Sequence, residues 1–393
     1  MSGAAVTQPG PPSPAAFDYR GGPRLVVGAG SLARLGSLAR ELGGTRALVA
    51  SDPGIVAAGH AAAGVAALAA AGLEAAVFSA FGENPTEAQI AAGAAVALDF
   101  RPDLLVGLGG GSSMDCAKGI NFLVSCGGRM RDYVGRGTAT GPLLPSIAVP
   151  TTAGTGSETQ SFTLVTHDDT GLKMACGDPR AAFRIAILDV ALTLTQPAAV
   201  AAATGVDAVA HAVESHVSRA ATPASRLFSR EAWRLLATHV PPVLAGGGTL
   251  ADRSAVQFGA ALAGLAIENS MLGAAHALAN PLTAAHGIVH GQAVGLALPH
   301  VVRFNAPACG PAYAELLAAI GAAAAPAAAG ERLAAWLDGL LATAGFPSTL
   351  ARFGIAAPDV PALAAAAARQ WTGGFNPRPV TATEFAALYE AVR

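Results

Sequence analysis

The sequence predicts two regions of different architecture, an α/β domain followed by an all-helical domain. Up to Asp189, short runs of branched apolar residues alternate with alanine-rich helical patterns. After Leu192 nearly every segment has helical periodicity, and no strand-like run follows. Alternating strands and helices are typical of βαβ units and a mainly parallel sheet. We therefore expect an α/β domain over residues 17–190 and a helical domain over residues 191–393.

Six short runs carry the strand signal of the first domain. They are RLVVGAG, RALVASD, EAAVFSA, DLLVGLGGG, PSIAVPTT and RIAILD. Between them lie helical patterns such as TEAQIAAGAAVAL. The length of 393 residues agrees with more than one domain, because single domains rarely grow so large.

The first sixteen residues differ from the rest of the chain. Residues 1–16, MSGAAVTQPGPPSPAA, are rich in Pro, Gly and Ala, and we expect a disordered tail. They have neither the basic region nor the apolar region of a secretory signal. The longest apolar stretches of the chain are mostly alanine with glycine breaks, so no membrane-spanning helix is expected.

Charge and cysteine content narrow the class of protein. The formal net charge is −2, which argues against nucleic acid as a partner because such proteins carry a basic surface. The four cysteines form no CxxC pair, so neither a disulfide framework nor a thiolate zinc site is expected. This cysteine usage fits the reducing cytoplasm.

Two glycine motifs compete for the role of a phosphate-binding turn. GAGSLA, residues 28–33, follows a strand and fits the Rossmann-like pattern G-x-G-x-x-A. The second motif, GGGSSMDCAK, contains Gly109, Gly110, Gly111 and Ser112 and also joins a strand to a helix. Three consecutive glycines cost more chain entropy than a plain turn requires. We therefore expect the second motif to hold the pyrophosphate at a helix N-terminus.

Polar residues at neighbouring strand ends extend this cofactor site. The loop PTTAGTGSET supplies the hydroxyls of Thr151, Thr152 and Thr155. Asp52 ends the strand ALVASD, where its carboxylate would accept from a ribose 2′-hydroxyl and repel a 2′-phosphate. Ligands of open α/β sheets bind at the carboxyl ends of the strands. The pattern favours NAD over NADP, although Asp52 is also placed to cap a helix.

A carboxylate and three imidazoles indicate a metal site in the helical region. GVDAVAHAV puts Asp207 and His211 one helical turn apart on one face. His276 lies on a helical pattern, and His290 follows what we expect to be a loop containing Pro281 and Gly287. A mixed nitrogen and oxygen set suits Fe²⁺ or Zn²⁺.

Spacing alone leaves the ligand set open. His286 and His290 also form an i, i+4 pair and are alternative ligands. The two lysines, Lys118 and Lys173, stand out because every other basic side chain among the 24 is arginine. We expect both lysines to be functional.

Together these motifs resemble the iron-containing, or group III, alcohol dehydrogenase family. The family is related to lactaldehyde reductase, maleylacetate reductase, glycerol dehydrogenase and dehydroquinate synthase. The resemblance runs from about residue 25 to the end and rests on VVGAGSLARLG, SDPG, ENPT, GGGSSMDCAKGI, PTTAGTGSET, KMA, GVDAVAHAVE, HGQAVGLALPHVVRFN and NPR. It implies a dehydroquinate synthase-like fold in which the metal and the nicotinamide meet between the two domains.

The resemblance also implies site residues. It gives Asp207, His211, His276 and His290 as metal ligands. His286 drops out of the ligand set because the family's two late histidines are fourteen residues apart, as are His276 and His290. The cofactor contacts are then Asp52, Asn84, Gly110, Gly111, Ser112, Asp115, Thr151, Thr152, Thr155, Leu164 and Lys173. GAGSLA becomes a strand-to-helix turn.

One position departs from the family pattern. Many members carry a histidine where this chain has Asn280, close to the nicotinamide and the substrate. An amide can orient a hydroxyl but cannot take its proton. The identity of the proton-relaying catalytic residue therefore stays open, with Asn280 and His286 as candidates near the substrate.

The resemblance implies a metal-dependent, NAD-linked alcohol dehydrogenase or aldehyde reductase. The cation would polarise a carbonyl group and NADH would supply hydride. A small alcohol or aldehyde is the expected partner, and a homodimer is possible on the family pattern. The alternatives are a maleylacetate reductase-like enzyme, a dehydroquinate synthase-like lyase that uses NAD catalytically, and a non-catalytic relative.

Overall fold

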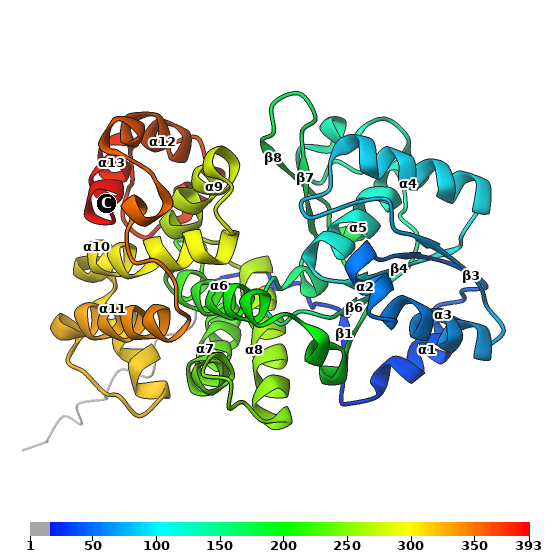
Figure 1. The fold of residues 1–393 in the computed structure, drawn as a ribbon, viewed down its shortest axis with the longest axis horizontal. Coiled ribbons are helices and arrows are strands. Elements are labelled where there is room, and N and C mark those ends of the chain that lie inside the picture. The colour runs from blue at the N-terminus through cyan, green and yellow to red at the C-terminus, as the bar shows by residue number, and fades with distance from the viewer. Residues whose placement is uncertain (1–15) are drawn as a thin grey trace, which may run out of the picture.

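The computed structural model describes residues 16–393. The expected disordered tail, residues 1–16, lies outside the described residues apart from Ala16. Figure 1 shows an α/β part formed by the first half of the chain beside a helical part formed by the second half.

The α/β part is built on a six-stranded parallel sheet with the order β1-β9-β6-β4-β2-β3. Its strands are β1 (Arg24–Val27), β2 (Arg46–Ala50), β3 (Glu74–Phe78), β4 (Leu104–Gly109), β6 (Ser146–Pro150) and β9 (Ile185–Leu188). All six coincide with the predicted strand runs. Every residue of β4, β6 and β9 is buried, which explains why these strands are nearly continuous apolar runs.

Helices cover both faces of the sheet. They are α1 (Leu35–Glu41), α2 (Pro53–Ala57), α3 (His60–Ala70), α4 (Glu87–Phe100) and α5 (Gly111–Cys126). In Figure 1, α4 and α5 lie above the sheet and α1 and α3 lie below it. Leu35 and Leu68 pack on one face with Val106, whereas Ile90 and Ile120 pack on the other with Leu105.

A second, small sheet was not predicted. It contains β5 (Gly135–Arg136), β7 (Phe162–Thr166) and β8 (Lys173–Gly177), and β7 pairs antiparallel with β8. The strand signal is weak because β5 has only two residues and because β7 and β8 are only partly buried. Strand β7 alternates buried and partly exposed residues, unlike the buried runs of the main sheet.

The second half of the chain is helical. After β9 come α6 (Ala198–Val217), α7 (Pro223–Leu244), α8 (Leu250–Glu268), α9 (Ala274–His286), α10 (His290–Ala319), α11 (Pro326–Thr343), α12 (Val360–Ala367) and α13 (Ala382–Ala391). Short 3₁₀ helices are η1 (Ser31–Arg34), η2 (Met130–Tyr133), η3 (Ser157–Thr159), η4 (Pro179–Ala181), η5 (Val190–Thr195), η6 (Leu350–Phe353), η7 (Ala357–Asp359) and η8 (Trp371–Phe375). Across residues 16–393, no helix is long and apolar enough to cross a membrane.

Pro281 lies inside α9, so the loop expected around it is wrong. The helix continues to His286 and ends at Gly287, whose φ of 66° is the left-handed conformation that favours glycine. A proline inside a helix removes one backbone hydrogen bond. Here Leu278 and Leu282 are buried on either side of Pro281, and this packing outweighs the local preference. Only residues 287–289 separate α9 from His290, which begins α10.

Candidate metal centre and cofactor site

Helix α6 carries the first two predicted metal ligands. Asp207 and His211 are both buried, and His211 Nε2 lies 3.5 Å from Asp207 Oδ1. The other ring nitrogen, Nδ1, lies 3.2 Å from the carbonyl oxygen of Gly154. When Nδ1–H donates to that carbonyl, Nε2 keeps a lone pair directed at the Asp207 side.

His276 and His290 reach the same carboxylate from α9 and α10. His276 Nε2 lies 3.4 Å and His290 Nε2 3.9 Å from Asp207 Oδ1. Asp207, His276 and His290 each offer one ligand atom, and these three atoms lie within 4.8 Å of one another. His211 does not join this tightest set, but its ring stacks on that of His276 at a centroid distance of 4.9 Å.

Unpartnered polar atoms test whether these residues fit a cation. Asp207 Oδ1, His276 Nε2 and His290 Nδ1 are buried and have no hydrogen-bond partner in the described part of the chain. Leaving such groups unpaired costs about 1–3 kcal/mol each. Asp207 Oδ1 and His276 Nε2 face one another at 3.4 Å without a hydrogen bond, and a carboxylate oxygen with imidazole nitrogens is the donor set of a divalent cation. The residues therefore fit the metal.

The charges of the cluster are strongly coupled. Burial raises the pKa of Asp207, but the three surrounding imidazoles outweigh it and hold that pKa well below its usual range. Burial lowers the pKa of His276, yet the nearby carboxylates of Asp207 and Glu214 raise it to about 9. Burial lowers the pKa of His290 to about 3, and Lys173 adds to this effect. Lys173 on β8 is thus close enough to the cluster to act on it.

The second glycine motif forms a tight turn between β4 and α5. Gly109 has a φ of 150°, and a Cβ on it would lie 2.2 Å from Ser113 Oγ. Gly110 precedes the first turn of α5, and Gly111 begins it. A Cβ on Gly111 would lie 3.0 Å from Thr155 Cγ2, so the glycine turn approaches the loop after β6 closely. These backbone N–H groups lie at a helix N-terminus, where phosphates bind.

The loop after β6 contributes hydroxyls at the same edge of the sheet. Thr151 Oγ1 and Thr152 Oγ1 are buried and have no hydrogen-bond partner within residues 16–393. A Cβ on Gly110 would lie 3.4 Å from Thr152 Cγ2, which places this threonine beside the glycine turn. Unpaired hydroxyls next to a helix N-terminus fit the polar atoms of a dinucleotide.

Asp52 and Asn84 border the turn from β2 and from the segment before α4. Asp52 Oδ1 accepts from the backbone N–H groups of Gly54 and Ile55, so Asp52 is the N-cap of α2. Its Oδ2 accepts from Ser113 Oγ at 3.1 Å. Asn84 adopts a φ of 53°, and its N–H donates to Ser112 Oγ at 3.2 Å. The carboxylate of Asp52 therefore caps α2 and is also the group expected to contact the ribose.

The two lysines lie around one buried carboxylate. Asp115 accepts from Ser157 Oγ at 3.1 Å, and burial raises its pKa to about 6 although Lys118 opposes the shift. Lys118 donates to the carbonyl oxygens of Ser157 and Phe162, both at 2.7 Å. Burial lowers the pKa of Lys118 to about 8 and also lowers that of Lys173. Lys118 therefore ties the loop after β6 to α5, whereas Lys173 is within range of Asp115 and Asp207.

Two backbone amides of the first glycine motif already bind a carboxylate of the protein. The carboxylate of Asp189, which follows β9, accepts from the N–H groups of Gly30 and Leu32, both at 2.9 Å. These are the groups that a phosphate would need at this turn. GAGSLA is consequently a structural turn, in agreement with the role that the family resemblance implied.

The remaining predicted residues lie in different surroundings. Asn280 is on α9, one turn after His276, and its Nδ2 donates to Gln370 Oε1 at 2.9 Å. His286 is exposed at the end of α9 and outside the tight metal cluster. Leu164 is 38% exposed on β7. Asn280 therefore makes a hydrogen bond to a distant segment of the chain, whereas His286 is exposed.

Two residues of this site escaped the sequence analysis. Glu214 Oε2 accepts from His276 Nδ1 at 2.6 Å. Its signal was present, because it follows Asp207 by two helical turns within GVDAVAHAVE. Gln370 is 90 residues from its partner Asn280, and no local pattern connects the two.

Comparison with known proteins covers nearly the whole chain. Residues 22–190 match the iron-containing alcohol dehydrogenase family, and residues 201–393 match the C-terminal part of the Fe-containing alcohol dehydrogenase family. The NAD-dependent methanol dehydrogenase of Bacillus methanolicus is 32% identical over 369 residues, 93% of this chain and 97% of the relative. Lactaldehyde reductase of Escherichia coli K12 is 30% identical over 92% of this chain and 96% of the relative.

Solved structures show the same fold. A 1,3-propanediol oxidoreductase superimposes with a TM-score of 0.93 at 33% identity, covering 96% of this chain and 100% of that one. Sulfoacetaldehyde reductase from Bifidobacterium kashiwanohense, solved with NAD⁺, gives a TM-score of 0.87 at 26% identity over 96% of this chain and 99% of that one. These matches confirm the predicted fold class and an oxidoreductase acting on alcohols. The chain belongs to the iron-containing alcohol dehydrogenase family.

Proposed function

We propose that this enzyme transfers hydride between NAD(H) and a small alcohol or aldehyde at a divalent metal held by Asp207, His211, His276 and His290. The main support is that one ligand atom from each of Asp207, His276 and His290 lies within 4.8 Å of the others, and that Asp207 Oδ1 and His276 Nε2 are buried without a hydrogen-bond partner among residues 16–393. The named relatives act on methanol, 1,3-propanediol and lactaldehyde, and the first is NAD-dependent.

The proposed active site consists of a metal site and a neighbouring cofactor site. Fe²⁺ or Zn²⁺, when bound, supplies Lewis acidity toward the substrate oxygen. Asp207 provides the negative charge of the ligand set, and the imidazoles complete a mixed nitrogen and oxygen environment. Gly154 belongs to the loop after β6 and also accepts from His211, so the cofactor loop and the metal cluster are held at a fixed separation.

The cofactor site is proposed at the carboxyl edge of β2, β4 and β6. The turn at Gly109, Gly110 and Gly111, together with Ser112, cradles the pyrophosphate, and Thr151, Thr152 and Thr155 bind along its side. Asp52 contacts the adenosine ribose, which favours NAD over NADP. Asn84, Asp115, Leu164 and Lys173 complete the set, and the charges of both Asp115 and Asp207 act on the pKa of Lys173.

Proton transfer is proposed to depend on solvent and not on a protein acid. Asn280 follows His276 by one turn, where an amide can orient a substrate hydroxyl but cannot exchange its proton. Gln370 fixes this amide by accepting from its Nδ2, which leaves Asn280 Oδ1 free to accept from a substrate hydroxyl. His286 is exposed at the far end of α9 and is the weaker candidate for the relay.

The direct test is metal-reconstituted enzyme with a panel of small aldehydes. We expect stoichiometric NADH oxidation that depends on Fe²⁺ or Zn²⁺ and is slower with NADPH. A dehydroquinate synthase-like lyase would show turnover without net NADH consumption, and a maleylacetate reductase-like enzyme would require the unsaturated oxoacid. Absence of aldehyde-dependent NADH oxidation under all metal conditions would contradict the proposal.

We also propose a domain boundary near residue 190, a homodimer and a cytoplasmic location. The domain boundary near residue 190 is tested by limited proteolysis between β9 and α6. A homodimer is tested by analytical ultracentrifugation. A cytoplasmic location, suggested by the cysteine usage, is tested by fractionation of the producing cell.

A further inference from the structure

Glu214 is a buried carboxylate on the same helix as Asp207 and His211. It is 4% exposed and lies three residues after His211 on α6. Its Oε2 accepts from His276 Nδ1 at 2.6 Å, and its Oε1 accepts from the N–H of Ala275 at 2.7 Å. Both oxygens of one carboxylate are therefore committed to the first turn of α9.

The start of α9 is shaped to receive this carboxylate. A Cβ on Gly273 would lie 2.9 Å from Glu214 Oε1, so glycine gives the carboxylate its approach to the helix. The first N–H groups of a helix have no partner within it, and a negative group there is favourable. Glu214 satisfies one of these N–H groups and binds the side chain of the next residue at the same time.

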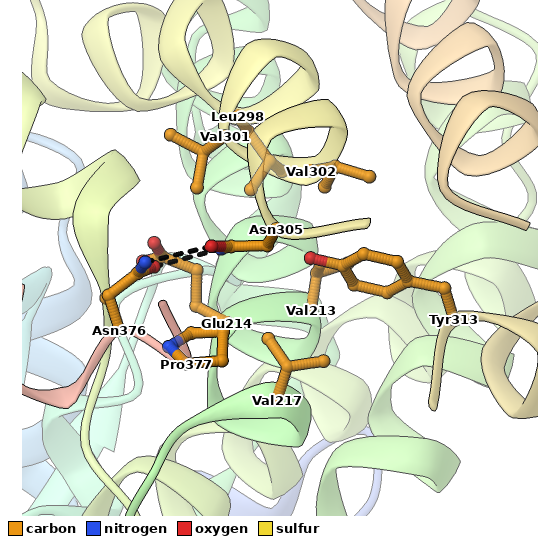
Figure 2. Close-up of a pocket in the computed structure, with 11 residues that line it drawn as sticks. Val213, Glu214, Val217, Leu298, Val301, Val302, Asn305, Tyr313, Asn376 and Pro377 are labelled. Atoms are coloured by element: carbon orange, nitrogen blue, oxygen red, sulfur yellow. Dashed lines mark hydrogen bonds between the residues drawn. The ribbon is translucent and has the colours of Figure 1, made fainter. Parts of the chain in front are cut away.

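A small pocket lined by Glu214, Asn305 and Asn376 lies beside Gly273, at the start of α9. Figure 2 shows Asn305 and Asn376 pointing toward one another across this pocket, with Glu214 beside Asn376. The two amides exchange hydrogen bonds of 2.9 Å in both directions. Asn376 Oδ1 also accepts from the N–H of Ala274 at 3.3 Å. The first turn of α9 is thus fixed by two buried side chains from distant segments.

We propose that Glu214 is a positioning residue for the metal, acting through His276. By accepting from Nδ1–H it fixes the tautomer in which Nε2 carries the lone pair, and it orients that lone pair toward Asp207. A carboxylate acceptor also makes the imidazole a stronger ligand. His211 has a neutral carbonyl, that of Gly154, in the corresponding place, so the negative acceptor is specific to His276. This inference rests on the proposed metal site.

The test is the Zn²⁺ dissociation constant of Glu214→Gln, measured by competition with a chromophoric chelator. Glu214 uses one oxygen for the backbone N–H of Ala275 and the other for the ring Nδ1–H of His276. Glutamine has one acceptor oxygen, so it cannot reproduce both hydrogen bonds in this geometry. We expect Zn²⁺ binding to weaken about ten- to a hundredfold. Glu214→Asp keeps the charge but is shorter, and we expect it to recover part of the lost affinity.

Asp189→Asn is the matched control for a purely structural effect. Asp189 is equally buried, and its carboxylate accepts backbone N–H groups of Gly30, Leu32 and Ala191. We expect this variant to lose stability in EDTA while keeping the wild-type Zn²⁺ affinity. Equal weakening of Zn²⁺ binding in Asp189→Asn and Glu214→Gln would overturn the positioning role.

The remaining outcomes separate this inference from the proposed function. Wild-type Zn²⁺ affinity in Glu214→Gln, with His276→Ala unable to bind, overturns the role of Glu214 and leaves the metal site standing. Wild-type affinity in His276→Ala instead overturns the metal site itself. If Glu214→Gln fails to fold, the Zn²⁺ affinity of Glu214→Asp is the test. Wild-type affinity in Glu214→Asp would show that Zn²⁺ binding does not require the contacts of both Glu214 oxygens with α9, which would overturn the proposal.

Discussion

His276 Nε2 faces Asp207 Oδ1 at 3.4 Å, and across residues 16–393 neither atom has a hydrogen-bond partner. The two residues come from α9 and α6, so their approach is a product of tertiary packing. Two buried, unsatisfied groups at this distance are costly unless a third species lies between them. A bound cation removes that cost, which makes metal binding and stability linked quantities.

Zn²⁺ should therefore stabilise the EDTA-treated protein against heat. At a free metal concentration of about one hundred times the dissociation constant, binding adds about 2.7 kcal/mol. In thermal denaturation we expect an upward shift of several degrees, lost in His276→Ala. His300→Gln, which changes a histidine elsewhere on α10, should keep the shift. An undiminished shift in His276→Ala would contradict the ligand assignment.

Asp52→Asn should relax the preference for NADH over NADPH. Asparagine is as good an N-cap as aspartate, so α2 should keep its first turn and the fold its stability. The substitution removes the negative charge that would repel a 2′-phosphate, an effect worth about 1 kcal/mol or more. Steady-state kinetics should show the kcat/KM ratio of NADPH to NADH rising about tenfold. An unchanged ratio would place the ribose elsewhere.

Asn280→His should introduce a proton relay that the natural enzyme lacks. An imidazole one turn after His276 can exchange a proton with the substrate, which an amide cannot. We expect kcat to rise about tenfold and its pH profile to gain an ionisation near the ordinary histidine pKa of about 6.5. Gln370→Ala serves for comparison, because it frees Asn280 without adding a titrating group. Identical rates and pH profiles in Asn280→His would show that this position does not face the substrate.

Glu158→Gln should stabilise the protein, and more so at alkaline pH. Burial raises the pKa of Glu158 from 4.5 to about 7, so the folded chain holds this proton more tightly than the unfolded chain. The free energy of unfolding of the wild type therefore falls as pH rises from about 5 to above 7. In urea denaturation with EDTA, the variant should gain up to about 3 kcal/mol at pH 8 and little at pH 5.

The exposed carboxylate of Glu41, paired with Arg24 at the surface, provides the control for that experiment. Glu41→Gln should change the unfolding free energy by less than about 1 kcal/mol and without the same pH trend. If Glu158→Gln shows an equal gain at pH 5 and pH 8, its effect comes from packing and not from the buried charge.

Local sequence determined much of the fold and much of the candidate site. The six strands of the main sheet coincide with apolar runs, because a strand buried on both faces must be apolar throughout. The i, i+4 spacing placed Asp207 and His211 on one helix face, since helical geometry depends on the chain alone. The hairpin of β7 and β8 was missed, and Pro281 was assigned to a loop, where packing overrides local preference.

Only the tertiary structure decided which residues from distant segments form hydrogen bonds with one another. Asp189 accepts from the N–H of Gly30 across 159 residues, and Glu214 accepts from His276 Nδ1–H across 62. Gln370 holds Asn280 across 90 residues. The sequence by itself determined the elements, the family and the residue types that carry the chemistry, because these follow from local geometry and composition. Packing decided which ring nitrogens face Asp207 and which amides remain free, because hydrogen bonds depend on the relative placement of whole helices and strands.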